Sequence, residues 1–284
     1  MSDPEILALK QRVADLETLI KHSPGMRSVY VGEQTLFIRL DGGRRIYIDS
    51  RDSVIAPQLQ TLGHWERDNT GIVRRLLKPG MRFVDIGANC GYFTLLAGSI
   101  VGEGGKVIAF EPQPRVFDLL NRSLRANGYV LRTVVHNVAL GDHDHTARFR
   151  FRDGDFGGGS LHISDSRARA EHFSELDVPV RRADDLLRAH APVDFIKIDA
   201  EGAEVAIIDG LSQTMAASPK LHILMEFNPG YINKHRKVTD FCAQLAALGF
   251  SPYPVTDSNP KKVSWESLLE VGGHGYVLFS RDGN

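Results

Sequence analysis

The sequence predicts an α/β fold in which helices cover both faces of a mostly parallel, doubly wound sheet. Between residues 83 and 139, short apolar runs typical of buried strands alternate with segments of helical periodicity. The first run leads into a glycine-rich turn, and strand-like runs at 251–255 and 275–279 close the chain with no helical pattern between them. We therefore expect the last strand to turn back antiparallel to the others.

A helix is predicted for residues 1–22, ahead of this fold. Apolar side chains recur at alternating spacings of three and four from Ile6 to Ile20, the period of a coiled-coil seam, and Ser-Pro-Gly at 23–25 ends the pattern. Two interpretations are open. The helix joins two copies of the chain as a homodimer, or it packs on its own domain.

Residues 23–60 are predicted to form a small β cap. The sequence Asp41-Gly42-Gly43 is typical of a tight hairpin turn between two strands. The strand-like runs are residues 29–31, 35–40 and 45–49.

The main domain is predicted to span residues 61–284. It begins with a helix between residues 61 and 79, which Pro79 and Gly80 end. The strands expected after it are residues 83–86, 106–110, 133–139, 194–199 and 221–227, and the helices are residues 92–101, 116–127, a segment from about 202, and 238–248.

Residues 145–182 interrupt this alternation and are predicted to form a β-hairpin insertion. The segment R-F-R-F-R at 148–152 places arginines on one face and phenylalanines on the other, and residues 177–182 are its expected partner strand. Arginine-aromatic strips occur on nucleic-acid-binding surfaces, but in a chain of net charge -1 we favour a half-buried edge strand. The glycines at 157–159 are open to two interpretations, a mobile flap over substrate or a solvated hairpin tip.

Composition excludes several classes of partner. The chain holds 34 Lys and Arg against 35 Asp and Glu, so no basic field favours nucleic acid or an anionic membrane. Cys90 and Cys242 are too few and too far apart for a disulfide framework or a metal site, which fits a reducing compartment. No apolar signal region opens the sequence, and no apolar run approaches the ~20 residues of a membrane span. We expect a cytoplasmic protein with neither nucleic acid nor membrane as partner.

The segment R-F-V-D-I-G-A-N-C-G at residues 82–91 indicates a buried strand that runs into a ligand-binding turn. A dinucleotide fingerprint requires G-x-G-x-x-G, but Asn89 and Tyr92 occupy the second and third glycine positions. No G-x-x-x-x-G-K-[ST] phosphate loop occurs in the sequence. NAD and a P-loop nucleotide are therefore excluded as ligands of this turn.

Two acids at strand ends point instead to S-adenosylmethionine as cofactor. Asp85 can meet the ammonium of its amino acid end, directly or through water, and Glu111, at the end of the next strand, can take both ribose hydroxyls. Backbone from Gly87 through Asn89 to Gly91 lets the cofactor lie against the chain. The N-terminus of the following helix favours the carboxylate of the cofactor.

Four blocks of sequence resemble the FkbM-type methyltransferases, class I S-adenosylmethionine-dependent enzymes that are mostly O-methyltransferases acting on natural products and sugars. The blocks are V-D-I-G-A-N-C-G-Y-F-T-L at 84–95, F-E-P at 110–112, V-A-L-G-D at 138–142 and I-K-I-D-A-E-G-A-E at 196–204, and the last is the most specific. The resemblance covers residues 63–280. It implies a Rossmann-like seven-stranded sheet with a reversed last strand, a small-molecule hydroxyl as methyl acceptor, and a substrate-facing insertion at 145–182.

The resemblance also places the rest of the cofactor site. Val138 ends the third strand, where class I relatives contact the adenine, and the neighbouring Asn137 is a candidate whose alternative is ordinary strand-end packing. Glu66 lies in a segment similar to the one that precedes the core in the family. Two roles are expected for it: it reaches the methionine end of the cofactor, or it places a negative charge at the start of a helix.

Catalytic residues are expected at the carboxyl ends of the strands, where doubly wound sheets bind their ligands. Methyl transfer requires the protein to orient the acceptor oxygen and to remove its proton. Asp199 is the first candidate, as a base beside the cofactor or as a ligand of Mg²⁺, and Glu226 is the second for both roles. Two roles are open for Glu201: catalysis, or a favourable negative charge at a helix N-terminus. For Glu204 we expect the second, structural role.

His274 and Cys90 complete the candidate site residues. His274, between two glycines before the last strand, is a base or a surface residue, and Cys90 is expected to be a small packed residue. Two rival classes stay open: a metal-dependent glycosyltransferase, favoured by Asp153-Gly154-Asp155, and a non-catalytic subunit that keeps the cofactor fold. Nitrogen and carboxylate acceptors stay open too.

Overall fold

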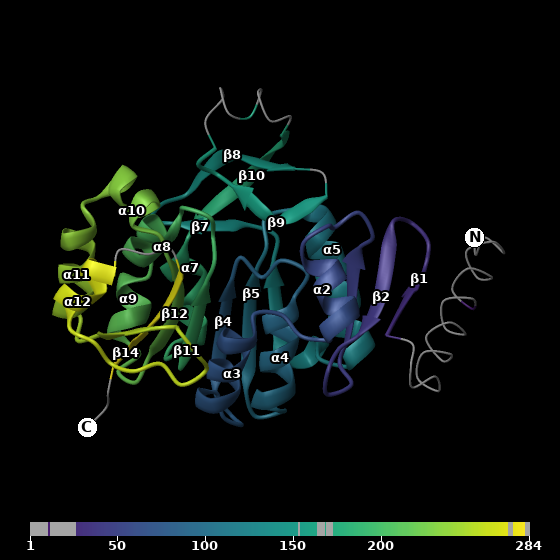
Figure 1. Cartoon of the computed structure of the whole chain (residues 1–284), viewed down its shortest axis with the longest axis horizontal. Helices are drawn as coiled ribbons and strands as arrows, with labels where there is room; N and C mark the ends of the chain where they lie inside the picture. Colours follow the sequence, from purple (N-terminus) through teal and green to yellow (C-terminus); the bar gives the residue numbers. More distant parts are fainter. Residues whose placement is uncertain are drawn as a thin grey trace.

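The computed structural model describes residue 11 and residues 27–152, 154–163, 168, 173–271 and 275–281. The predicted helix at 1–22, apart from residue 11, lies outside these ranges, as do Asp153 and His274. The described chain forms a central sheet with helices on both faces and two smaller sheets beside it (Figure 1). None of the helices described is both long and apolar enough to cross a lipid bilayer.

The central sheet has seven strands in the order β13-β14-β12-β11-β4-β5-β6. The strands are β4 (Arg82–Ile86), β5 (Lys106–Phe110), β6 (Thr133–His136), β11 (Phe195–Ile198), β12 (His222–Phe227), β13 (Ser251–Pro254) and β14 (Gly275–Ser280). The β14 strand lies between β12 and β13 and runs antiparallel to both, whereas the neighbours from β12 to β6 are all parallel. The predicted α/β fold with a reversed last strand is confirmed.

Helices cover both faces of this sheet. The first face carries α2 (Ile55–Leu62), α3 (Arg67–Leu76), α4 (Tyr92–Val101) and α5 (Pro114–Asn127), and the second carries α7 (Ala183–Leu187), α8 (Glu204–Gly210), α9 (Ser212–Ala216), α10 (Pro229–His235), α11 (Val238–Ala247) and α12 (Trp265–Val271). Because side chains alternate along a strand, Phe83 and Phe195 pack on the first face, where their rings stack 5.3 Å apart, and Val84 and Ile196 pack on the second. This double cover explains why the central strands are apolar along their whole length.

The structure confirms most of the predicted helices and contains others that the sequence does not predict. The helix expected between residues 61 and 79 is present as α3, whereas α2 lies mostly within the range predicted to form the β cap. Gly63, with φ 74°, ends α2, and Glu66, with φ 40°, precedes α3. The α12 helix lies between β13 and β14, where the sequence predicts none, since its seven residues are too few to show a clear period. The helix expected from about residue 202 begins at Glu204.

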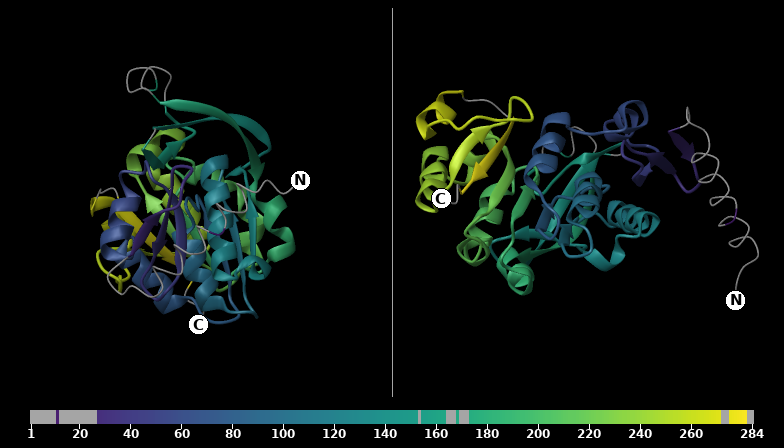
Figure 2. Two further views of the ribbon diagram at one scale, coloured as in Figure 1. Left: turned by 90° about the vertical axis from the view of Figure 1, so that its right-hand side faces the viewer. Right: turned by 90° about the horizontal axis from the view of Figure 1, so that it is seen from below.

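A three-stranded antiparallel sheet, formed by β1 (Ser28–Tyr30), β2 (Thr35–Arg39) and β3 (Arg45–Asp49), packs on α5 (Figure 2). The β2 and β3 strands pair directly across the glycine turn predicted at residues 41–43. This sheet falls within the range predicted to form the β cap.

The second small sheet has the order β7-β10-β8-β9 and is formed by β7 (Ala139–Gly141), β8 (His145–Arg152), β9 (Asp155–Ser160) and β10 (Ser174–Arg182). The prediction of an edge strand at 148–152 is wrong, because β8 lies between β10 and β9. Its Arg150 is buried and donates to Glu175 at 2.8 Å.

The glycines at 157–159 belong to β9 and do not form a hairpin tip. Glycine has a low propensity for β-strands, so residue propensities do not predict this strand. Packing explains it: a Cβ at Gly159 would lie 2.3 Å from Cζ of Phe149, so the backbone can approach β8 only without a side chain. The flap interpretation stays a prediction.

Candidate active site

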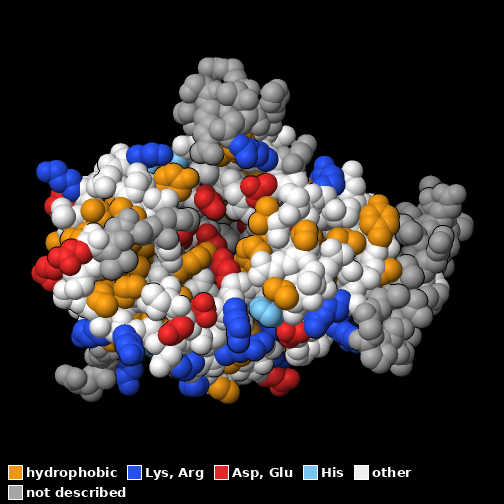
Figure 3. Space-filling model, viewed as in Figure 1, with side chains coloured by type: hydrophobic (Ala, Val, Ile, Leu, Met, Phe, Trp, Pro, Cys, Tyr) orange, Lys and Arg blue, Asp and Glu red, His pale blue; other side chains and the backbone are white. Residues whose placement is uncertain are grey.

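A pocket of about 420 Å³ lies at the carboxyl edge of the parallel strands. Acidic side chains line the hollow at the centre of the face seen in Figure 3. The acidic residues of the pocket are Glu66, Glu111, Asp155, Asp199, Glu201 and Glu226, against one basic residue, Lys197, among the described residues that line it. This volume is in the range of small-molecule and cofactor sites.

The turn between β4 and α4 forms one wall of the pocket. Gly87 has φ 76°, and a Cβ there would lie 1.9 Å from the carbonyl oxygen of Asp199. Gly91 has φ 91°, and a Cβ there would lie 2.2 Å from Cδ1 of Leu120. Both positions require glycine, so backbone at Gly87 lines the pocket where other residues would carry a side chain.

Glu111 directly follows β5 and lines the pocket. Its Oε2 accepts a hydrogen bond from the backbone N–H of Asn89 at 2.8 Å, and its Oε1 accepts one from that of Gln113 at 2.9 Å. Burial raises the pKa of the carboxyl to about 7, against the lowering effect of these two bonds. A carboxylate has about four lone-pair sites, so Glu111 is held in place and still has acceptor capacity for a ligand.

Asp85, Asn137 and Val138 lie at different depths around this wall. Val138 lines the pocket. Asp85 is buried behind the lining residues; its Oδ2 accepts from Thr94 Oγ1 at 2.5 Å, Oδ1 has no partner in the described part of the chain, and burial raises its pKa. Asn137 donates from Nδ2 to the carbonyl oxygen of Glu111 at 2.8 Å, so it supports the loop that carries Glu111.

Asp199, Glu201 and Glu226 form a carboxylate cluster in the same pocket, with one oxygen of each within 4.8 Å of the others. Burial, followed by the charges of Glu226 and Asp199, raises the pKa of Glu201 to about 8. A carboxyl with this pKa mostly holds a proton at neutral pH and becomes available as a base above about pH 8. Carboxylate oxygens are also the ligands that Mg²⁺ prefers.

Sequence reasoning misses Lys197 and Tyr276, which also line the pocket. Lys197 Nζ donates to Asp199 Oδ2 at 2.8 Å, and the hydroxyl of Tyr276 lies 2.8 Å from the same oxygen and 3.0 Å from Glu66 Oε1. Burial lowers the pKa of Lys197, but the charges of Asp199, Glu66 and Asp85 outweigh this effect and raise it overall. A lysine inside an otherwise apolar strand indicates a buried partner of opposite charge. This feature of the sequence could have identified Lys197.

Backbone strain concentrates at this pocket. The non-glycine residues with positive φ include Glu66 (40°), Asn89 (49°) and Glu201 (50°), all of which line it, and the other two described, Glu33 and Gln34, form the turn between β1 and β2. Such conformations cost roughly 1–3 kcal/mol each and cluster at functional sites. Their placement at this pocket is therefore typical of a functional site.

Glu204 and Cys90 are both buried, and of the two only Cys90 is among the residues that line the pocket. Glu204 Oε1 accepts from the backbone N–H groups of Ala200 and Gly202, both at 3.2 Å, and burial raises its pKa to about 7. Burial also raises the pKa of the Cys90 thiol, which disfavours the thiolate that a nucleophile would need.

Phe149 and Phe156 of the four-stranded sheet, with Leu161 just after β9, supply an apolar wall. Asn89 Nδ2 donates to the carbonyl oxygen of Phe156 at 3.3 Å and joins this wall to the glycine turn. Asp155 of the D-x-D sequence also lines the pocket.

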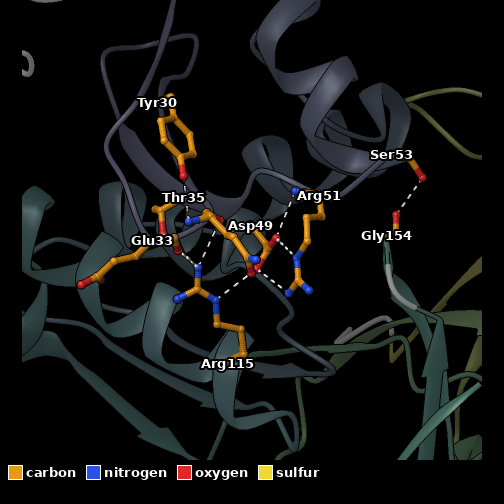
Figure 4. Close-up of polar contacts among 9 residues, drawn as sticks. Tyr30, Glu33, Thr35, Asp49, Arg51, Ser53, Arg115 and Gly154 are labelled. Carbon is orange, nitrogen blue, oxygen red and sulfur yellow. Dashed lines mark hydrogen bonds and ion pairs between the residues drawn. The ribbon is translucent and has the colours of Figure 1, made fainter.

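Figure 4 shows polar contacts that link the end of β3 and the loop after it to α5 and to the residue before β9. Arg115 at the start of α5 donates from Nε to Asp49 Oδ2 at 3.1 Å, and Arg51 donates from Nε to Asp49 Oδ1 at 2.9 Å. Ser53 donates from Oγ to the carbonyl oxygen of Gly154, just before β9, at 2.7 Å (Figure 4). The next residues of this loop line the pocket, so the cap contributes to its closure.

Known proteins that this chain resembles include methyltransferases. The family model described as Methyltransferase FkbM domain matches residues 85–252. The methyltransferase sdnD of Sordaria araneosa is 26% identical over 156 residues, which cover 46% of this chain and 60% of that protein. Methyltransferase 1 of Beauveria bassiana is 28% identical over 145 residues, which cover 45% and 57%. The chain thus matches less than two thirds of the length of these relatives.

Solved structures give a more distant likeness. The O-methyltransferase TomG from Streptomyces achromogenes, involved in tomaymycin synthesis and solved in complex with SAM, is 14% identical, with 81% of this chain and 82% of that chain covered and a TM-score of 0.45. A likeness of this degree says nothing about the substrate of this chain.

Proposed function

This chain belongs to the family of FkbM methyltransferase domains, and we propose that it transfers a methyl group from S-adenosylmethionine to a hydroxyl oxygen of a small molecule, sugar or natural product. The observation that carries the proposal is the pocket at the carboxyl edge of the sheet. There a glycine turn and Glu111 share one cavity with the carboxylates of Asp199, Glu201 and Glu226.

The residues of the pocket fit this cofactor. Glu111, fixed by two backbone N–H groups, retains acceptor capacity for the ribose hydroxyls. Val138 and Pro112 offer apolar surface for the adenine, and the backbone at Gly87 leaves room for the methionine part.

When bound, S-adenosylmethionine supplies a methyl group that its sulfonium has already activated. The residues of the chain then have to hold the acceptor hydroxyl in line and take up its proton. We assign proton uptake to the cluster of Asp199, Glu201 and Glu226. Lys197 and Tyr276 both bond to Oδ2 of Asp199, so Oδ1, to which no described residue donates, is the oxygen we assign to the acceptor.

Calorimetric titration of the full chain with S-adenosylmethionine, S-adenosylhomocysteine, NAD and UDP-glucose tests the cofactor, each with and without Mg²⁺. We expect binding of the two adenosyl compounds only, and an affinity about tenfold or more weaker in Glu111→Ala, because its hydrogen bonds to the ribose hydroxyls are lost. Failure to bind either adenosyl compound would overturn the proposal, and binding of UDP-glucose would favour a glycosyltransferase. An Mg²⁺ effect on affinity would support a metal at the carboxylate cluster.

The acceptor atom is tested by incubation with S-adenosylmethionine and catechol, methyl glucoside, benzylamine or benzoate, followed by mass spectrometry of the products. A methylated hydroxyl on catechol or the glucoside is the expected result. Methylation of benzylamine alone, or of benzoate alone, would mean that the acceptor is a nitrogen or a carboxylate and not a hydroxyl. S-adenosylhomocysteine in place of the cofactor is the control.

A further inference from the structure

Tyr276 reaches the pocket because β14 is reversed. The parallel strands bring their carboxyl ends to this edge of the sheet, whereas β14 brings its amino end, and Tyr276 there pairs with Glu226 of β12. Tyr276 and Glu66 both lie outside the range of residues 85–252 that matches the family. Their contact therefore does not follow from that match.

The hydroxyl of Tyr276 joins two carboxyl groups from distant parts of the sequence. It lies 2.8 Å from Asp199 Oδ2 and 3.0 Å from Glu66 Oε1, while Glu66 Oε2 accepts a bond from Asn69 Nδ2 at 2.8 Å. A phenol has one proton to donate, so the two carboxylates share one donor. Glu66 is thereby held at both of its oxygens.

This group of side chains has an excess of negative charge. The carboxylates of Glu66 and Asp199 outnumber the one ammonium, Lys197 Nζ, which lies 2.8 Å from Asp199 Oδ2. In a partly enclosed pocket such an excess favours a cation. S-adenosylmethionine carries two positive groups, an ammonium and a sulfonium, against one carboxylate.

On the basis of the proposed function, we propose that Tyr276 is a positioning residue whose hydroxyl joins Glu66 and Asp199 into a paired-carboxylate wall for the sulfonium of S-adenosylmethionine. The wall adjoins the turn assigned to the cofactor, since the Asp199 carbonyl oxygen lies against Gly87. The terminal torsion of an aspartate is broad, so its carboxylate needs donors to fix it. Without the phenol hydroxyl, the two carboxylates repel each other and separate.

The change Tyr276→Phe removes the hydroxyl and keeps the ring. In calorimetry of the full chain we expect the Kd for S-adenosylmethionine to rise about tenfold. The Kd for S-adenosylhomocysteine should rise no more than about threefold, because its neutral thioether gains less from the carboxylate wall. The matched control is Tyr129→Phe, a half-buried tyrosine outside the pocket whose hydroxyl makes no bond within the described chain, and it should leave both values unchanged.

The change Glu66→Gln removes the negative charge at the other end of the same contact. If urea unfolding shows that Tyr276→Phe does not fold, Glu66→Gln tests the proposal on its own. Glu66→Gln should also weaken S-adenosylmethionine more than S-adenosylhomocysteine. The effects of the two changes should be less than additive, because they act on one unit. Equal weakening of both ligands, no weakening, or full additivity would overturn the inference. If the wild-type chain binds neither adenosyl compound, the proposed function itself fails, which is a separate result.

Discussion

Lys197 occupies β11 between Ile196 and Ile198, which are fully buried, and its own side chain is only 3% exposed. An unpaired ammonium at such a place would cost several kcal/mol in desolvation. The carboxylate of Asp199 at 2.8 Å compensates for this cost, and the ring of Phe93, with its centroid 4.7 Å from Nζ, adds a cation–π contact. The charge of Lys197 therefore stabilises the acidic side of the pocket.

The change Lys197→Met keeps an apolar stem of similar length and removes this charge. We expect the free energy of unfolding to fall by about 2–3 kcal/mol, somewhat below the usual cost of breaking a buried ion pair, because the Asp199 side chain is 25% exposed and water can solvate it. Urea unfolding measures the loss. The exposed Lys220 provides the control Lys220→Met, which should change stability by less than about 0.5 kcal/mol. A loss no larger than that of the control would contradict the role of Lys197 as counter-charge.

At the scale of elements, the pocket is built where strands end. The β4, β5, β11 and β12 strands contribute residues at or just after their carboxyl ends, and β14 contributes one at its amino end. The turn after β4 lies directly against the end of β11, and this contact determines how close the glycine turn and the carboxylate cluster are.

The pair Gly87→Ala and Gly80→Ala tests this contact. Both glycines have similar φ, 76° and 84°, so alanine brings about 1–2 kcal/mol of backbone strain at either position. A Cβ at Gly87 would also lie 1.9 Å from the Asp199 carbonyl oxygen, whereas one at Gly80 meets nothing within 4 Å. In urea unfolding we expect a loss of about 1 kcal/mol for Gly80→Ala and of at least about 3 kcal/mol, or no folding, for Gly87→Ala. Equal losses would mean that β4 and β11 are not in tight contact at this turn.

The sequence predicts the central sheet well because its strands are continuous apolar runs separated by helices. The same pattern places Glu111, Asp199 and Glu226 in one pocket, since parallel strands bring their carboxyl ends to one edge. Asp85 is less well predicted: it shares the strand face of Phe83, two residues before it, and so bonds to Thr94 of α4 behind the pocket wall.

Other features escape sequence reasoning for identifiable reasons. Tyr276 lies at the amino end of a reversed strand, to which the rule about carboxyl ends does not apply, although the reversal itself is predicted. The β9 strand contains three consecutive glycines, whose pairing depends on Phe149 packing against Gly159 and not on their own propensity. The left-handed conformations of Glu66 and Glu201 result from the surrounding structure, because neither residue type favours them.

At the scale of the whole molecule, three parts of the chain enclose the pocket: the edge of the central sheet, the wall from β8 and β9, and the cap loop that Ser53 joins to Gly154. Their enclosure keeps carboxyl groups away from water. Burial raises the pKa of Glu111, which lines the pocket, to about 7 from 4.5, and it has the same effect on Glu204, which is buried but is not among the residues that line the pocket.

This burial links stability to pH. Between pH 4.5 and about 7, the folded chain keeps protons on Glu204 and Glu111 that the unfolded chain has released. The resulting contribution to stability is complete in acid and is lost as the pH rises through the folded-state pKa. His162 acts in the other direction, because burial lowers its pKa from 6.5 to about 4 and the unfolded chain then holds more protons in that window. The pH dependence of stability is therefore a sum of contributions of opposite sign. The contribution of one group has to be measured separately from the others.

The change Glu204→Gln isolates one such group. Glutamine retains an oxygen that can accept from Ala200 and Gly202 but has no proton to lose at these pH values. We expect the free energy of unfolding of the variant, relative to the wild type, to rise by about 2–3 kcal/mol between about pH 5 and about pH 8, as measured by urea unfolding without cofactor. The exposed Glu103 provides the control Glu103→Gln, whose difference from the wild type should stay constant. A constant difference for Glu204→Gln as well would mean that the two backbone N–H groups keep Glu204 ionised in the folded chain, so that burial would not determine its protonation.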